Sequence, residues 1–231
     1  WRMPAMYVGE YAERDAEVTL KLWQRLSIEL RNEELMDVFT LETKLFPCLV
    51  DMRFKGVRVD LEHAVKSKKN LIVRENKLLK EIKGLVGFDV EISAARSIAK
   101  AFDKLKLPYD RTAKSNEPSF TKNFLQNHPH ALPKAIADAR EINKAHSTFI
   151  DSITKHSVNG RIHADINQIR SDQGGTVTGR FSMSNPNLQQ IPARHPEIGP
   201  MIRSIFIPEE KTVWGSFDYS QQEPRILVHY A

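Results

Sequence analysis

The chain has 231 residues, of which 41% are hydrophobic and 27% charged. This balance excludes an intrinsically disordered protein, and the length suits one or two domains with cores of their own. The single cysteine, Cys48, excludes an internal disulfide framework or a cysteine-rich zinc site and indicates a reducing compartment. Apolar runs such as LFPCLV are far too short for a membrane span, and we expect no signal peptide.

The formal net charge of +5 is unevenly distributed along the chain. Residues 1–60 carry 9 basic and 11 acidic side chains, residues 61–160 carry 18 and 11, and residues 161–231 carry 7 of each. A local basic excess is typical of a surface that faces a polyanion such as nucleic acid. A solvated lysine-rich helix face gives the same count, so charge alone does not decide between the two.

The first two-thirds of the chain are predicted to be mainly helical, because apolar residues recur there at the spacing of one helix face. A turn and a short strand are expected over residues 55–60, and a polar loop over 108–119. The predicted helices cover residues 10–38, 41–54 with a bend at Pro47, 61–86, 93–107 with Ser93 as the cap, and 133–156.

The pattern changes in the last third. Asn159-Gly160 predicts a hairpin turn, and alternating apolar residues predict a strand over 162–166. Residues 170–200 are rich in Gly, Ser, Asn and Pro and are predicted to be irregular. Two strands, over 202–208 and 212–218, and a helix from Ser220 are then expected. The sequence therefore predicts an α+β fold.

The strongest chemical signal is Asp218, which is expected at the end of an apolar strand just before a helix. Mg²⁺ is typically held by one or two carboxylates together with substrate phosphates, so Asp218 is a candidate ligand. A turn or capping role is the alternative for an aspartate at a strand end. Ser220 and Glu223 fit a capping box, with Pro224 in the first turn of the helix.

Three motifs resemble family A DNA polymerases, the bacterial DNA polymerase I group. Residues 218–225, DYSQQEPR, resemble motif A, DYSQIELR, and residues 178–192, TGRFSMSNPNLQQIP, resemble the segment TGRLSSxxPNLQNIP. Tyr11 and Asp15, in YAERDAEVTL, resemble the Y-x-x-x-D motif that closes the 3′–5′ exonuclease domain. The motifs have the family's order and spacing, and the resemblance covers essentially the whole chain.

The resemblance implies template-directed transfer of dNMP to a primer 3′-hydroxyl, in DNA replication or repair. Asp218 would be one of two aspartates that hold two catalytic Mg²⁺ ions, with the backbone carbonyl of Tyr219 completing the shell. Glu223 would lie under the incoming sugar and exclude a 2′-hydroxyl. The implied nucleotide-binding residues are Tyr219, Ser220, Gln221 and Glu223.

The resemblance also implies contacts to primer–template DNA. Arg180 would reach the minor groove at the primer terminus, where acceptors common to all base pairs test pairing geometry. Arg140 and Lys144 lie four residues apart on the predicted helix that would lie beside the primer duplex. The other implied DNA-binding residues are Ser147, Thr148, Asn187, Gln189, Gln190 and Arg225.

The implied fold is a mainly helical thumb plus the N-terminal part of an antiparallel palm sheet. Residues 1–40 would be the last exonuclease helix, with Tyr11 and Asp15 as remnants, residues 41–160 the thumb, and residues 161–231 the palm up to motif A. Residues 170–175 add length, as in phage-type members, which indicates a viral or prophage source. Departures from the quoted motifs include Met183, Gln190, Gln222 and Pro224.

The fingers and the second catalytic aspartate do not follow in these 231 residues, so we expect the chain alone to be incomplete and inactive as an enzyme. The missing segment would come from the same parent chain or from a second polypeptide, as in a split polymerase. A non-catalytic module that binds duplex DNA is the alternative from a different class. The expected partners are primer–template DNA and dNTP, with no membrane, in the cytoplasm of a bacterial or phage-infected cell.

Overall fold

The computed structural model describes residues 5–171, 174–193 and 195–231, with side chains from Tyr7 onward. Asp172 and Gln173, which belong to the added stretch 170–175, lie outside the described residues. The chain forms two compact units. The first unit comprises Trp1–Lys55 and Ile166–Ser182, and the second comprises Gly56–Asp165 and Met183–Ala231.

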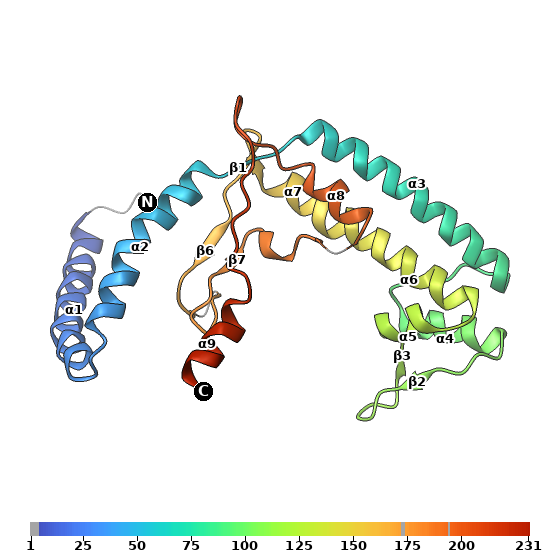
Figure 1. Cartoon of the computed structure of the whole chain (residues 1–231), viewed down its shortest axis with the longest axis horizontal. Coiled ribbons are helices and arrows are strands. Elements are labelled where there is room, and N and C mark those ends of the chain that lie inside the picture. The colour runs from blue at the N-terminus through green and yellow to red at the C-terminus, as the bar shows by residue number, and fades with distance from the viewer. Residues whose placement is uncertain (1–4, 172–173, 194) are drawn as a thin grey trace. The chain divides into compact units, whose positions relative to one another are not determined.

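Two helices dominate the first unit (Figure 1): α1 (Ala5–Asn32) and α2 (Met36–Lys55). The prediction of one helix over 10–38 is wrong, because α1 ends at Asn32 and the chain turns through Glu34 at φ 57° before α2 begins. Pro47 lies inside α2, as predicted. Most apolar side chains of both helices are exposed, so the described part of the first unit has little core of its own.

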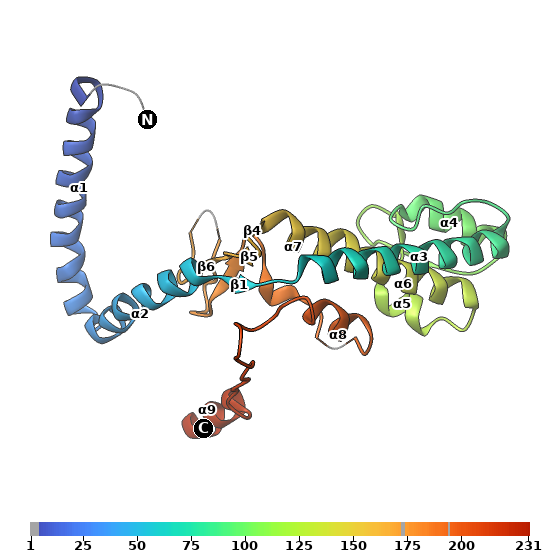
Figure 2. The same cartoon turned by 90° about the horizontal axis from the view of Figure 1, so that it is seen from above.

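Long helices form the second unit, and α3 runs alongside α6 and α7 in both Figure 1 and Figure 2. The carboxylate of Asp60 accepts the His63 N–H at 2.8 Å and caps the start of α3, and Gly87 ends the helix at φ 83°. The predicted helices 61–86 and 133–156 are confirmed, the second with a π-helical turn in its middle. The elements are α3 (Leu61–Val86), α6 (Ala131–Lys144), the π-turn η1 (Ala145–Ile150) and α7 (Asp151–His156).

Smaller elements gather at the far end of α3 and α6 (Figure 2). Ser93 does not cap the next helix, because its hydroxyl donates to the Glu91 carboxylate at 2.8 Å and Ala94 holds the cap position. The predicted loop 108–119 contains a hairpin of two short strands. The tip consists of α4 (Ala95–Lys104), β2 (Asp110–Arg111), β3 (Pro118–Ser119) and α5 (Lys122–Asn127).

The second unit has two apolar clusters, which explains how a long and narrow helical structure stays folded. Burial of each large side chain contributes about 1.5–3 kcal/mol. The tip cluster includes Ile82, Ile98, Phe102, Leu125, Leu132 and Ile136. The base cluster includes Leu71, Ile142, Ile150, Ile162, Ile202 and Ile205.

A small antiparallel sheet closes the base of the helical part. Its order is β1-β5-β4, with β1 (Val57–Arg58) and β4 (Ser157–Val158) on either side of β5 (Arg161–Ile162). The predicted hairpin is confirmed: Asn159 and Gly160 take φ values of 50° and 73°, as a two-residue hairpin turn requires.

The rest of the chain is less regular than predicted. The strand expected over 202–208 is wrong, because α8 extends to Arg203 and only Phe206 forms a bridge, to Val59. The strand expected over 212–218 is also wrong, since this segment has no regular structure. The remaining elements are β6 (Asp165–Asn167), which pairs with β7 (Ser182–Ser184), the 3₁₀ turn η2 (Leu188–Gln190), α8 (Ile198–Arg203) and α9 (Gln222–Tyr230).

Long helices with small antiparallel sheets confirm the α+β class. Among the described residues, no helix is both long and apolar enough to cross a membrane.

Candidate nucleic-acid interface

The continuous helix formed by α6, η1 and α7 has one exposed, polar side and one buried side. Lys144, Ser147 and Thr148 are exposed there, while His146 and Ile150 on the other side are buried. The Lys144 ammonium lies 5.6 Å from the centre of the Phe149 ring, a cation–π distance that orients this long side chain.

Arg140, four residues before Lys144, lines a cleft together with it but is half-buried, and its guanidinium is bound within the protein. Its Nε donates to the Ile92 carbonyl at 2.6 Å and its Nη1 to the Phe120 carbonyl at 2.9 Å. Burial lowers the pKa of the guanidinium, because a low-dielectric site disfavours its charge. Arg140 therefore ties α6 to the tip, and its contact with DNA stays a prediction.

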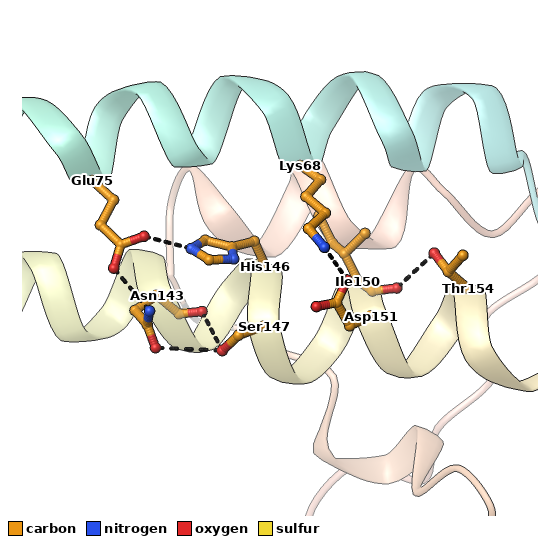
Figure 3. Close-up of polar contacts among 8 residues, drawn as sticks. All are labelled: Lys68, Glu75, Asn143, His146, Ser147, Ile150, Asp151 and Thr154. Atoms are coloured by element: carbon orange, nitrogen blue, oxygen red, sulfur yellow. Dashed lines mark hydrogen bonds and ion pairs between the residues drawn. The ribbon is translucent and has the colours of Figure 1, made fainter. Parts of the chain in front are cut away.

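A buried polar group connects η1 to α3 (Figure 3). The side chain of Glu75 in α3 points at the opposite helix. Its Oε2 lies 2.6 Å from Nε2 of His146, and its Oε1 accepts a hydrogen bond from Nδ2 of Asn143 at 2.8 Å. The Ser147 hydroxyl donates to the Asn143 carbonyl at 2.8 Å. Sequence reasoning missed this group. The signal for it in the sequence is that an acidic residue stands four positions after Leu71, within the apolar stripe of a helix whose other side is basic.

The loop after β7 brings three of the predicted DNA contacts to the surface. The Asn187 side chain caps η2, because its Oδ1 accepts the Gln189 N–H at 3.1 Å. Gln189 and Gln190 are exposed, whereas the neighbouring Leu188 packs against the base cluster. Apolar packing thus holds the polar residues of this turn outward.

Two neighbouring clefts bring the helix and this loop together. A cleft of about 340 Å³ is lined by residues that include Lys144, Phe149 and Gln190. A second of about 150 Å³ is lined by residues that include Thr148, Asn187 and Gln190. Arg140 also lines the first cleft, so five of the residues predicted to bind DNA line these two clefts, although they come from two segments far apart in the sequence.

Arg180 belongs to the first unit and is exposed. The Thr176 hydroxyl donates to the Arg180 carbonyl at 2.7 Å, across a turn that passes through Gly179 at φ 75°. The turn fixes the backbone from which the guanidinium extends. The contact of Arg180 with DNA stays a prediction.

Asp218 and Tyr219 lie in the irregular segment before α9, and both are exposed. The expected capping box at Ser220 is not formed, because Gln221 holds the cap position at φ 54° without a side-chain cap bond. A concave surface of about 560 Å³ is lined here by Asp218, Tyr219, Ser220, Gln222, Arg225, Ile226, His229 and Tyr230.

Within the described part of the chain, no three His, Cys, Asp or Glu side chains lie together as a metal cluster. Tyr11 and Asp15 lie one turn apart on α1, where both are exposed. The Thr19 hydroxyl donates to the Asp15 carbonyl at 2.7 Å.

Comparison with known proteins agrees with the motifs. The family model for DNA polymerase family A matches residues 62–231. The DNA-directed DNA polymerase of Pseudomonas phage M6 is 35% identical over 241 residues, with 100% of this chain and 36% of the relative covered. The thermostable DNA polymerase I of Thermus filiformis is 33% identical over 232 residues, with 96% of this chain and 27% of the relative covered. The chain thus spans little more than a third, or less, of the length of these relatives.

The fold has a counterpart among solved structures. The POL domain of Pol1 from M. smegmatis, solved in complex with DNA primer-template and dNTP, superposes with a TM-score of 0.70 at 23% identity. The superposition covers 83% of this chain and 34% of the other. The phage relative agrees with the phage-type resemblance read from residues 170–175. From the motifs, the family model and these relatives, we conclude that the chain belongs to DNA polymerase family A.

Proposed function

We propose that this chain supplies the thumb and the first part of the palm of a DNA-directed DNA polymerase, and that it binds primer–template duplex. The observation that carries the proposal is the shared surface of Lys144, Thr148, Asn187 and Gln190. A lysine and a threonine can bind phosphate oxygens, and amide side chains can bind both backbone and base edges.

The distribution of charged side chains supports this surface more strongly than the net charge of the chain does. Several basic side chains of α3 are already held in ion pairs at the surface, which reduces their attraction for phosphates. Lys144 has no carboxylate of this kind in the contacts described for it, and its ammonium lies against the Phe149 ring. In the described part of the chain, the surface ion pairs of α3 lysines and arginines include Lys68–Asp151, Arg74–Glu197 and Lys83–Asp89, at 2.5, 2.6 and 2.8 Å.

In the proposed enzyme, Asp218 holds a divalent metal ion, which we take to be Mg²⁺. The donor set fits such an ion in part: the exposed Asp218 carboxylate and the Tyr219 carbonyl are hard oxygen ligands beside a concave surface. A bound Mg²⁺ pair would activate the primer 3′-hydroxyl and stabilise the pyrophosphate leaving group. A second carboxylate must come from a segment outside these 231 residues, in the same chain or in a second polypeptide.

The start of α9 would bind the incoming dNTP. Ser220 and Gln221 precede the helix, and Tyr219 and Arg225 line the same concave surface as Asp218. Glu223, in the first turn of α9, would exclude the 2′-hydroxyl of a ribonucleotide by occupying its space.

The subdomain boundaries at residues 40 and 160 stay part of the proposal, as does the origin of Tyr11 and Asp15 in an exonuclease helix. Replication or repair in the cytoplasm of a bacterial or phage-infected cell is the setting we propose.

The proposal is tested by titrating the chain with primed duplex, single-stranded DNA and a polyanion without base pairs, such as heparin. Tighter binding of primed duplex supports it, whereas equal binding of all three would contradict it.

A further inference from the structure

The buried carboxylate of Glu75 is the starting point, because it is an acidic residue in the core of a basic structure. Glu75 is 8% exposed and His146 is also 8% exposed. A buried carboxylate costs several kcal/mol unless hydrogen bonds compensate for the loss of water. Here each oxygen has its own partner, Nε2 of His146 at 2.6 Å and Nδ2 of Asn143 at 2.8 Å.

Both partners lie at the point where the helix departs from α-helical geometry. His146 is the second residue of η1, and the Asp151 N–H donates to the His146 carbonyl five residues back, as in a π-helix. Hydroxyl groups bind carbonyls at either end of the turn: Ser147 donates to Asn143 at 2.8 Å and Thr154 to Ile150 at 3.0 Å. π-turns are rare and often mark functional sites, so the side-chain hydrogen bonds that stabilise this turn need an explanation.

Hydrogen bonds lead from the buried carboxylate to the surface. The Asn143 side chain donates from Nδ2 to Glu75, and its Oδ1 accepts the Ser147 hydroxyl at 3.3 Å. The bond to Glu75 fixes which way the Asn143 amide faces, because a carboxylate only accepts. Ser147 is exposed and is followed by Thr148, which lines the cleft shared with Asn187 and Gln190.

We propose that Glu75 is a positioning residue for DNA binding, which fixes η1 through His146 and Asn143 and thereby holds Ser147 and Thr148 toward the phosphates of the duplex. This inference rests on the proposed function, because it requires the surface around η1 to bind duplex DNA. It adds a residue of α3 that itself touches no DNA.

A second connection between the same helices serves as the matched control. Lys68 of α3 and Asp151 of α7 form an ion pair at 2.5 Å, with 37% and 44% of their side chains exposed. Figure 3 shows the pair two turns along α3 from Glu75, on the same pair of helices. The variant Asp151→Asn therefore weakens the packing of these helices without touching the buried group.

The experiment compares Glu75→Leu, Glu75→Gln and Asn143→Ala with Asp151→Asn in the full 231-residue chain. The first readout is amide hydrogen exchange of residues 145–151, measured relative to the amides of the tip cluster, in the absence of DNA. Exchange should be faster by about tenfold in Glu75→Leu and Asn143→Ala, because the turn loses its side-chain bonds. Glu75→Gln should stay within about twofold of wild type, since an amide of the same length still accepts from Asn143 and fills the same buried space.

The second readout is affinity for primed duplex as a function of salt. Glu75→Leu and Asn143→Ala should bind about tenfold more weakly at moderate salt, while Glu75→Gln retains affinity. Asp151→Asn, which frees the Lys68 ammonium, should bind no more weakly than wild type. If Glu75→Leu does not fold, Asn143→Ala carries the test, because Asn143 is only half-buried.

The outcomes separate three claims: that Glu75 positions η1, that this positioning supports DNA binding, and that the chain binds primed duplex. Exchange that is equally fast in all variants overturns the positioning of η1 by Glu75. Faster exchange with unchanged DNA affinity overturns its link to DNA binding. A wild-type chain that does not prefer primed duplex contradicts the proposed function itself, and the inference with it, even if exchange changes as expected.

Discussion

Arg140 of α6 donates a hydrogen bond from Nε to the backbone carbonyl of Ile92 at 2.6 Å, and its Nη1 reaches the Phe120 carbonyl at 2.9 Å. One guanidinium thus satisfies two carbonyls of the tip. A side chain in this role contributes to stability through the acceptors that it satisfies.

Arg140→Met should therefore lower the free energy of unfolding by about 1–3 kcal/mol, because two part-buried carbonyls lose their charged donor. Chemical denaturation measures this change. Arg140→Lys should not restore the loss, since an ammonium lacks the planar fork of donors. A fully stable Arg140→Met chain that has lost DNA affinity would mean that Arg140 contacts DNA, as the resemblance implies, and does not stabilise the tip.

Lys144→Met should weaken binding to primed duplex by removing one phosphate contact. The slope of log affinity against log salt should fall by about 0.9, the value for one neutralised phosphate. Lys21→Met is a charge-matched control, because Lys21 lies in the first unit and pairs with Glu17 on α1 at 2.5 Å. An equal fall in both variants would mean that only the net charge matters.

The chain alone should not extend a primer in the presence of Mg²⁺ and dNTP. Two-metal chemistry needs carboxylates that hold two ions about 3.5–4 Å apart, and motif A provides only Asp218. A primer-extension assay with purified chain measures this. Template-dependent extension that disappears in Asp218→Ala would contradict the expectation.

Glu223→Ala should relax sugar discrimination in an enzyme completed by the missing segment. Removal of a steric gate should lower the ratio of kcat/KM for dNTP over rNTP about tenfold or more, which corresponds to about 1.4 kcal/mol. Loss of a capping box should not contribute to any change in stability, because Gln221 rather than Ser220 holds the cap position of α9.

Val228→Ala, at an exposed residue of α9 outside the lining of the concave surface, is the control for this experiment and should leave the ratio unchanged. If Glu223→Ala keeps the ratio and instead lowers the melting temperature, Glu223 acts on the stability of α9 and not on the sugar.

The helices of the second unit were predictable because their signals are local. The apolar stripe of residues 61–86 and the Asn159-Gly160 turn both gave the observed elements. The strand expected over 212–218 failed because apolar residues alone predict a strand only when a neighbouring strand pairs with it. In this structure Phe217 is 97% exposed and the segment stays irregular.

The candidate site was predictable residue by residue only through its resemblance to a family. Lys144, Thr148 and Gln190 were singled out in this way, but their meeting at two clefts depends on a fold that brings distant segments together. Arg140 and Glu75 show the limit of spacing arguments. A basic residue four positions from Lys144 turned out to bind carbonyls, and an acidic residue in an apolar stripe turned out to be buried and paired.

The short sheet at the base has a consequence for how the second unit could change in evolution or by design. The chain leaves this point at Val57 and returns to it at Ile162, its antiparallel partner, and Val59 donates to the Gly160 carbonyl at 2.9 Å. The segment between these residues begins and ends at the sheet, where backbone hydrogen bonds hold its two ends together. Lengthening or replacing the tip would leave those ends where they are, so the tip can be exchanged between relatives as a cassette.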